Sequence, residues 1–327
     1  MTPGSIRRSL MAAIACIGLA AALPQAFAQQ RYPGRPITMI VPFAPGNVTD
    51  SIARLIADRL PQELGQAVVV ENKAGASGGI GMAALGRAAP DGYTIGLSAI
   101  GPLALNPALY PKLAYDAENG FSMISVVYRG PIVVLVDPKS PYRTLKDLIE
   151  QSKRASIEYA TPGAGSSQHL TAELLQHVSG ARLVHVPNRG SGQAAALLLG
   201  NHVPVLFEVT SVAVPYVRNG QMRALAISSA QRLPALPDVP TVAESGYPGF
   251  SAEGWLCVVT PAGVPAGIQQ RLADAVRKVM HLPEVQAQIA NFGGFAESMS
   301  PAQSTAFVHA DTARWGELIR SAGIKLE

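Results

Sequence analysis

The chain has 327 residues, of which 48% are hydrophobic, 15% are charged and 6% are aromatic. This balance is typical of a globular protein and excludes a disordered chain, a collagen and a coiled coil. The formal net charge is only +4, so we expect no broad basic face and no nucleic-acid partner. A chain of this length has room for roughly two domains and for a core that needs no disulfide or metal.

The N-terminus has the anatomy of a secretory signal peptide over residues 1–28. Arg7 and Arg8 precede an apolar run, and the small residues Ala26 and Ala28 mark a cleavage site after Ala28. The apolar run covers about 14 residues, which is short for a membrane span, and an uncleaved anchor is the alternative. We therefore expect export to the periplasm. Cleavage leaves Cys257 as the remaining cysteine, so the mature chain can form no intramolecular disulfide.

Apolar runs and helical patterns alternate through the first half of the mature chain. A buried strand is expected at residues 37–43, followed by a helix at 51–64 that ends at Gly65. The pattern then predicts, in order, a strand at 67–70, a glycine-rich loop at 75–81, a helix at 82–89 and a strand at 93–98. This alternation predicts a parallel sheet with crossover helices.

A second α/β unit follows, and after it a helical C-terminal part. The predicted strands of the unit lie at residues 132–136, 158–160, 184–186, 203–208 and 224–228. Its predicted helices lie at residues 144–154, 167–178 and 190–200. A further helix begins near Pro265. Ser300 and Gln303 form a capping box with Pro301 at the first helical position, which predicts the start of the last helix.

These elements predict two α/β lobes. We assign residues 29–128 and 252–327 to a discontinuous first lobe and residues 129–251 to an inserted second lobe. The chain is expected to cross between the lobes near residues 125–131 and 250–259. Two crossing segments form a natural hinge, with a cleft between the lobes.

Three segments share one design, in which a strand ends, a turn containing glycine follows and a helix begins. They cover residues 42–50, 162–169 and 187–191. The first turn of a helix has unpaired N–H groups and about half a positive charge, so it favours a carboxylate or phosphate. Each turn alone is more often ordinary α/β structure. Three such turns in two facing lobes favour an anion-binding cleft, with hydroxyl donors from Thr49, Ser166, Ser167 and Ser191.

Signatures of catalysis are weak. Residues 75–79 match G-x-S-x-G, so an exported serine hydrolase using Ser77 is an alternative, although residues 72–74 separate the motif from the preceding strand. The sequence has no P-loop, no G-x-G-x-x-G and no H-E-x-x-H. We therefore expect no enzyme, no cofactor and no metal site. His169, near a helix start, is either a donor in the cleft or an ordinary structural histidine.

The same turns carry a resemblance to a known family. The segments YPGRPI (32–37), VPFAPGNVTD (41–50), VENKAGA (70–76), PDGYT (90–94) and NPALY (106–110) occur in this order. They are followed by GAGS with HL (163–170), HVP (185–187) and LPDVPTVAESG (236–246). In this ordered combination the chain resembles the Bug-type periplasmic solute receptors of tripartite tricarboxylate transporters, over essentially its whole mature length.

The resemblance implies a two-lobed type II periplasmic-binding-protein fold with the ligand cleft between the lobes. It implies a monomer that captures a small organic carboxylate and delivers it to the permease subunits of a membrane transporter. A sensory receptor that docks on a signalling partner is an alternative, because the fold alone does not decide between them. The candidate binding residues are Phe43, Ala44, Pro45, Gly46, Asn47, Thr49, Asp50, Gly163, Ala164, Gly165, Ser166, Ser167, His169, Asn188, Arg189 and Glu208.

The sequence departs from the usual family pattern at several of these positions. Asn47 replaces a second glycine, and because asparagine tolerates left-handed backbone we expect the turn to be kept. Asn188 and Arg189 replace a Tyr-Lys pair, and Arg189 keeps the charge in a planar guanidinium. Pro204 and Glu208 stand where aspartate is common. The choice among dicarboxylates, tricarboxylates, aromatic acids and acidic amino acids therefore stays open.

Overall fold

The structure is a computed structural model that describes residues 32–324. The expected signal peptide and its cleavage site after Ala28 lie outside the described residues. Arg35 begins the compact unit to which the sheets and helices belong. In this described part of the chain, none of the helices combines the length and the apolar character that a bilayer crossing requires.

The first sheet has the strand order β2-β1-β3-β9-β4. Its strands are β1 (Ile37–Val41), β2 (Val68–Asn72), β3 (Thr94–Ala99), β4 (Phe121–Val136) and β9 (Glu253–Pro261). β1 is parallel to β2 and β3, whereas β9 is antiparallel to both β3 and β4. The sheet is therefore mixed rather than parallel throughout, because β9 and β4 carry the chain to and from the second sheet.

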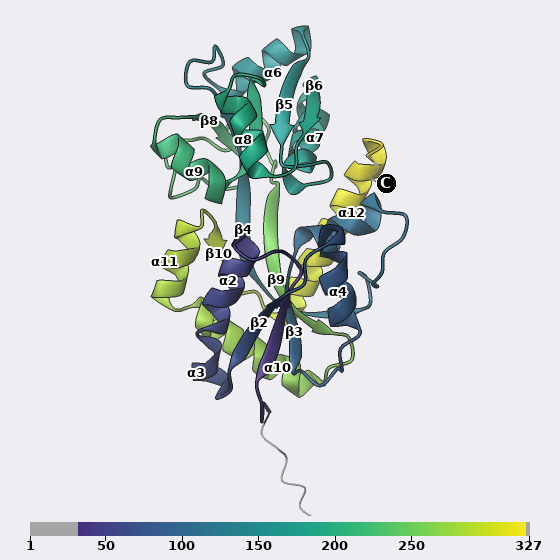
Figure 1. The fold of residues 1–327 in the computed structure, drawn as a ribbon. Coiled ribbons are helices and arrows are strands. Elements are labelled where there is room, and N and C mark those ends of the chain that lie inside the picture. The colour runs from purple at the N-terminus through teal and green to yellow at the C-terminus, as the bar shows by residue number, and fades with distance from the viewer. Residues whose placement is uncertain (1–31, 325–327) are drawn as a thin grey trace, which may run out of the picture. The chain divides into compact units, whose positions relative to one another are not determined.

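The second sheet is built on the last part of β4. Residues 132–136 pair with β7 (Val205–Val209) on one side and with β8 (Arg223–Ile227) on the other. β7, β5 (Ile157–Thr161) and β6 (Leu183–Pro187) are parallel neighbours. β4 thus belongs to both sheets, and Figure 1 shows it with β9 between the two lobes.

Helices cover the sheets on the sides that carry apolar residues. Those of the first lobe are α2 (Val48–Ala57), α3 (Leu60–Leu64), α4 (Gly79–Gly86), α5 (Asn106–Leu109), α10 (Ala266–Met280), α11 (Pro283–Asn291) and α12 (Pro301–Ser321). Those of the second lobe are α6 (Leu145–Arg154), α7 (Ser167–Ser179), α8 (Ser191–Leu199) and α9 (Thr210–Arg218). Shorter elements are a 3₁₀ turn at Ala76–Gly78, a π-helix at Gly101–Leu105 and strand β10 (Phe295–Ala296), which pairs with β4.

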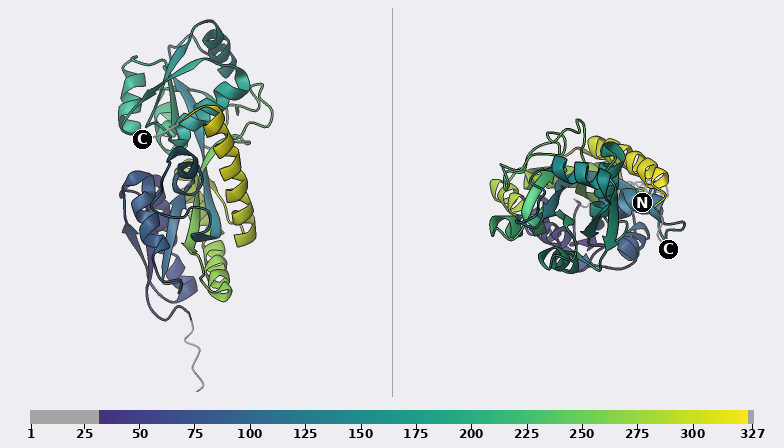
Figure 2. Two further views of the ribbon diagram at one scale, coloured as in Figure 1. Left: turned by 90° about the vertical axis from the view of Figure 1, so that its right-hand side faces the viewer. Right: turned by 90° about the horizontal axis from the view of Figure 1, so that it is seen from above.

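Helix α12 lies along the strands that connect the lobes (Figure 2). It begins with the expected capping box at Ser300. The hydroxyl of Ser304 accepts a hydrogen bond from the amide of Val126 in β4 (2.9 Å). Asp311 accepts from the indole N–H of Trp255 in β9 (2.7 Å). These buried polar contacts fix the helix to both connecting strands, and one apolar core runs through them from the first lobe to the second.

The helix expected at residues 51–64 is two helices. α2 begins at Val48, because the side chain of Asn47 caps it, and ends at Ala57. α3 has Pro61 in its first turn. Proline has no N–H to continue the α2 hydrogen-bond ladder, so the helix breaks before it. The apolar periodicity runs through both helices, which is why it predicted a single one.

Helix α9 and strand β9 are absent from the sequence expectations, which give residues 250–259 only as a segment crossing between the lobes. α9 contains Pro215 in its interior, and proline is ordinarily a helix breaker. β9 starts with Glu253 and Gly254 and is buried almost throughout, so it shows no alternation of apolar and polar residues. α9 packs against β4 and β7 and β9 lies between β3 and β4, so tertiary packing rather than local pattern accounts for both elements.

Candidate functional site

The strand register brings the carboxyl ends of both sets of parallel strands to one place. Ala99, at the end of β3, pairs with Leu256 near the start of β9, and β1 runs parallel to β3. Val209, at the end of β7, pairs with Ile132, and β5 and β6 run parallel to β7. Since β4 passes from the first sheet to the second between Pro131 and Ile132, the two sets of strand ends face this crossing from opposite sides (Figure 1).

The first turn leads from β1 into α2. Asn47 is the N-cap, and its side chain accepts a hydrogen bond from the amide of Asp50 at 2.9 Å. The left-handed residue of the turn is Gly46, with φ of 88°, whereas Asn47 has φ of −84°. The turn is thus formed, but Asn47 does not use its tolerance of left-handed backbone, because Gly46 takes that conformation and Asn47 caps the helix. The amides of Val48 and Thr49 have no acceptor within the helix.

Asp50 anchors this turn. Its side chain is buried and accepts hydrogen bonds from the amide of Gly46 (2.9 Å), from Arg54 Nε (3.1 Å) and from Asn72 Nδ2 (2.9 Å). Burial disfavours its charge, but the hydrogen bonds from Arg54, Gly46 and Asn72 outweigh burial and lower the pKa of Asp50. The carboxylate is thus occupied by the protein itself and holds the turn in shape.

The tip of the first turn is exposed. Ala44, Pro45 and Gly46 are exposed, Phe43 and Asn47 are half-buried, and Thr49 is buried. The carbonyl of Phe43 accepts a hydrogen bond from Asn72 Nδ2 at 3.1 Å, which fixes the start of the tip. The turn therefore offers backbone groups on a rigid frame.

The second turn leads from β5 into α7. Ser166 is the N-cap: its hydroxyl accepts from the amide of His169 (3.2 Å) and donates to the carbonyl of Gly163 (2.7 Å). The amide of Gly165 donates to His169 Nδ1 at 3.1 Å. The hydroxyl of Ser167 donates to Gln168 Oε1. Ala164 is exposed at the tip of this turn.

The third turn, between β6 and α8, lies against the second. The amide of Gly190 donates to the carbonyl of Pro162 at 2.8 Å, and Asn188 Nδ2 donates to the carbonyl of Thr161 at 3.1 Å. The starts of α7 and α8 are thereby held side by side. Arg189, in the third turn, is exposed. Arg189 therefore places a positive charge in the third turn.

A stack of titratable rings lies beneath the second turn. The rings of His169 and His185 are parallel, with centroids 3.9 Å apart, and Tyr159 stacks on the other face of His185. Burial, together with His169, lowers the pKa of His185 to about 4. His169 Nε2 lies 3.6 Å from Glu173 Oε1, which also accepts from the Tyr159 hydroxyl. Both ring nitrogens of His169 are therefore occupied within the second lobe.

Glu208, at the end of β7, is fully buried beside the same turns. Its Oε1 accepts from Gln168 Nε2 (3.0 Å) and from the amide of Val209 (2.7 Å). Burial, against these two hydrogen bonds, raises the pKa of Glu208. The second-sheet side of the crossing is thus lined by backbone amides, hydroxyls and a carboxyl group that resists ionisation.

The sequence alone missed the side chains that hold these turns. Arg54 and Asn72 fix Asp50, and Gln168 fixes Glu208. The four-residue spacing of Asp50 and Arg54 on one helix is a signal that could have paired them. Asn72 and Gln168 contact their partners across 22 and 40 residues of sequence, so only the fold reveals them.

Ser77 sits in a strained turn, with φ of 51°. Its hydroxyl hydrogen-bonds the Tyr110 hydroxyl at 2.8 Å. The side-chain partner of this serine hydroxyl is thus a phenol, whereas a serine nucleophile is ordinarily activated by a histidine. Residues 32–324 also contain no cluster of three or more histidine, cysteine or acidic side chains that could hold a metal ion.

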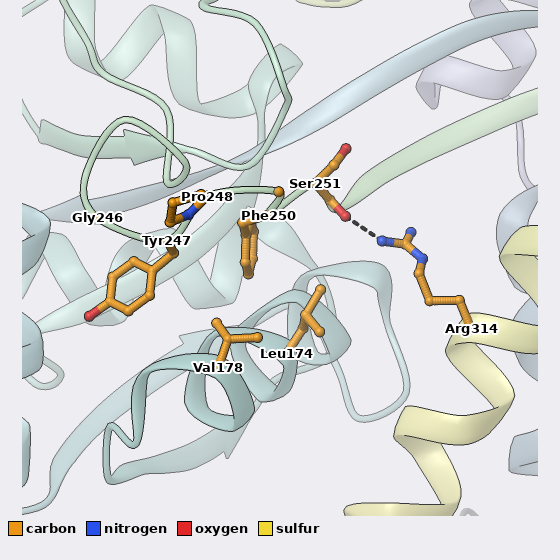
Figure 3. A pocket seen from close by; sticks show the side chains of 9 residues that line it. Leu174, Val178, Gly246, Tyr247, Pro248, Phe250, Ser251 and Arg314 are labelled. Carbon is orange, nitrogen blue, oxygen red and sulfur yellow. Dashed lines mark hydrogen bonds between the residues drawn. The ribbon is translucent and has the colours of Figure 1, made fainter.

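One cavity lies away from the turns. It has a volume of about 410 Å³ and is formed by apolar side chains of α7 and of the segment 246–251, with Arg314 of α12 at its edge. Figure 3 shows the Arg314 guanidinium directed to the carbonyl of Ser251. It also contacts Asp311 Oδ1. The cation is therefore committed to structural partners.

A second cavity, of about 230 Å³, adjoins the crossing and contains Arg129, Glu253 and Glu297 among its lining residues. Arg129 lies 2.9 Å from Glu253 and 2.6 Å from Glu297. Two carboxyl groups already surround this guanidinium. The cavity therefore does not favour another anion.

Comparison with known proteins gives a consistent result. A family model described as "Tripartite tricarboxylate transporter family receptor" matches residues 52–324. The chain is 38% identical to the protein BugT of Bordetella pertussis, over 96% of each chain.

Solved structures are similar over nearly the whole described chain. A structure of an R. palustris protein with adipate has a TM-score of 0.80 and 31% identity, covering 90% of this chain and 100% of that one. MatC from Rhodopseudomonas palustris with bound malate has a TM-score of 0.74 and 29% identity, covering 88% and 100%. The expected two-lobed α/β fold is confirmed.

Proposed function

Because this chain belongs to the family of tripartite tricarboxylate transporter receptors, we propose that it captures a small organic carboxylate between its two lobes. The observation that carries this proposal is that the starts of α2, α7 and α8 converge on the place where β4 and β9 pass between the two lobes. Each start offers unpaired amides and a partial positive charge. The carboxylates bound by the similar structures, adipate and malate, support the chemical class.

In this proposal the carboxylate is held mainly by backbone. The exposed tip at residues 44–46 and the amides of Val48 and Thr49 serve one end of the ligand. The turns at residues 163–167 and 188–191 serve the other end, with Arg189 as the cation. Asp50, His169 and Glu208 belong to the site, the first two by holding the turns in shape. Closure of the lobes excludes water and strengthens these contacts.

The lobes that close are those expected from the sequence, residues 29–128 with 252–327 and residues 129–251. The receptor acts in the periplasm as a monomer, after cleavage following Ala28, and delivers its ligand to the permease subunits of its transporter. Co-purification tests this partner: recovery of the permease supports transport, whereas recovery of the extracellular domain of a signalling kinase supports a sensory role.

The receptor binds without chemistry. The Tyr110 partner of Ser77 supports this, since a tyrosine hydroxyl is not the histidine base that ordinarily activates a serine nucleophile. Replacing Ser77 with alanine should leave carboxylate binding intact. If the protein hydrolyses an ester substrate and the S77A variant loses that activity, the hydrolase alternative is correct.

The experiment is a thermal-shift screen of the mature protein against malate, adipate, citrate, benzoate and aspartate. A ligand present at a hundred times its Kd adds about 2.7 kcal/mol of stability. We expect one or more of these acids to raise the melting temperature. If none of them does, and calorimetry also detects no binding, the proposed function is wrong.

A further inference from the structure

Glu208 has a carboxyl oxygen without a partner. While its Oε1 is doubly hydrogen-bonded, Oε2 is buried and has no hydrogen-bond partner within residues 32–324. A buried polar atom without a partner raises the free energy of the structure. The position therefore suits a further group that can hydrogen-bond to Oε2.

The position of Glu208 indicates what this group is. Glu208 directly precedes Val209, the N-cap of α9, and is bonded to Gln168 in the first turn of α7. Ser191, the first residue of α8, also interacts with its carboxyl group. The starts of α7 and α8 are two of those to which the proposed function assigns the ligand carboxylate. An anion held there is adjacent to Glu208.

The surroundings of Glu208 favour its neutral form. The groups that face it are the Gln168 amide from α7, the Ser191 hydroxyl from α8, the Val209 amide and Val133 of the paired strand β4. None of these groups carries a charge, and no ion pair of Glu208 occurs in the described part of the chain. A nearby ligand carboxylate further disfavours ionisation, because two adjacent carboxyl groups do not both ionise readily.

Building on the proposed function, we propose that Glu208 is a specificity-determining residue that binds in its protonated form and donates the hydrogen on Oε2 to the ligand carboxylate. The site then selects acids that present an acceptor oxygen at this point. It disfavours acids that place an ammonium group there, because an ammonium group requires an ionised Glu208. Among the open ligand classes, the inference favours simple carboxylates over acidic amino acids.

The test uses two variants of the full mature protein and a control. Glu208→Gln replaces the O–H donor with an N–H donor of the same shape that does not titrate. Glu208→Leu removes the donor. Glu158→Gln changes a carboxylate at an exposed position of β5 and is the control. Thermal melts verify that each variant is folded.

The ligand is whichever of malate, adipate, citrate and benzoate binds the wild type most tightly. Its affinity is measured by calorimetry from pH 6 to 9. Aspartate, which carries an ammonium group, is measured for comparison. Wild-type affinity should fall by up to tenfold per pH unit above the pKa of Glu208. E208Q should lack this slope and bind more tightly than wild type at pH 9. E208L should bind roughly tenfold or more weakly than E208Q. The control should keep the wild-type slope.

Two results would overturn the inference and leave the receptor function standing. In the first, the E208Q variant loses the binding that wild type shows, and the wild type prefers aspartate to the other acids. In the second, the E208L variant binds the ligand as tightly as wild type, and the affinity of neither protein changes with pH. Absence of carboxylate binding by the wild type at every pH overturns both the inference and the proposed function.

Discussion

The turn before α2 and the turns before α7 and α8 face one another across the crossing, but they are held by different chemistry. The first is fixed by an ionised carboxylate, Asp50, whose pKa is lowered by its partners. The others are fixed by a serine hydroxyl, a histidine ring and an amide, with Glu208 behind them. The lowered pKa of Asp50 keeps the first turn charged at neutral pH, whereas Glu208, the carboxyl group beside the other two turns, has a raised pKa.

This difference suggests a division of roles. A turn fixed by a permanent charge network presents the same amides at all physiological pH values. The turns before α7 and α8 lie beside Glu208, whose raised pKa lets a change in its protonation alter affinity. The second lobe is therefore the side on which both ligand selection and pH dependence should be found.

The largest expected effect is the loss of the Asp50 network. Asp50→Ala leaves Gly46, Asn72 and Arg54 without their common acceptor, so we expect a loss of about 2–4 kcal/mol in unfolding free energy. Denaturant unfolding at pH 7 measures this loss.

The contribution of Asp50 to stability depends on pH. Because the folded pKa of Asp50 is lowered, this contribution is fully present above about pH 4 and is lost as the pH falls further. Asp58→Ala, an exposed acid after the same helix, should change stability by about 0.5 kcal/mol or less.

The next effect is a pH dependence of stability from His185. Its folded pKa of about 4 lies below the usual value of 6.5, so the unfolded chain binds the proton more tightly. The contribution of the neutral His185 ring to the free energy of unfolding is fully present above pH 6.5 and decreases as the pH falls toward 4. We expect a loss of about 1–2 kcal/mol after allowance for partial exposure. Denaturant unfolding at pH 7 and at pH 5 should show this loss of unfolding free energy in wild type. The loss should be smaller in the His185→Asn variant. His309→Asn, exposed on α12, should retain the wild-type dependence; an equal loss in all three proteins would refute the assignment.

The smallest effect separates stability from binding. Ser166→Ala and Ser300→Ala each remove an N-cap hydroxyl, so each should cost about 1 kcal/mol of stability. Ser166 caps the helix start that faces the crossing, whereas Ser300 caps α12. Calorimetry should therefore show weaker carboxylate binding for S166A alone. Equal affinities in the two variants would remove the α7 turn from the site.

The sequence predicted the elements whose pattern is local. The strand at β1, the cap of α12 and the glycine turns before α7 and α8 were all visible from residue type and spacing. The break at Pro61 and the helix around Pro215 were not, because tertiary packing decides how a proline is accommodated.

For the site, the sequence located the turns but not what holds them. The glycine and cap residues mark each turn in the chain, whereas the contacts of Asp50 with Asn72 and of Glu208 with Gln168 depend on which strands are neighbours. Strand order, in turn, was set by β9, which the pattern did not reveal. The role of Asn47 as a cap rather than a left-handed residue likewise required the backbone angles.

The most direct measurement is a crystal structure of the mature protein with the tightest-binding acid from the panel. We expect carboxylate oxygens within hydrogen-bond distance of first-turn amides of α2 on one side and of α7 or α8 on the other, with one oxygen next to Glu208. A ligand bound instead in the cavity beside Arg314, or one that touches a single lobe, would contradict the account.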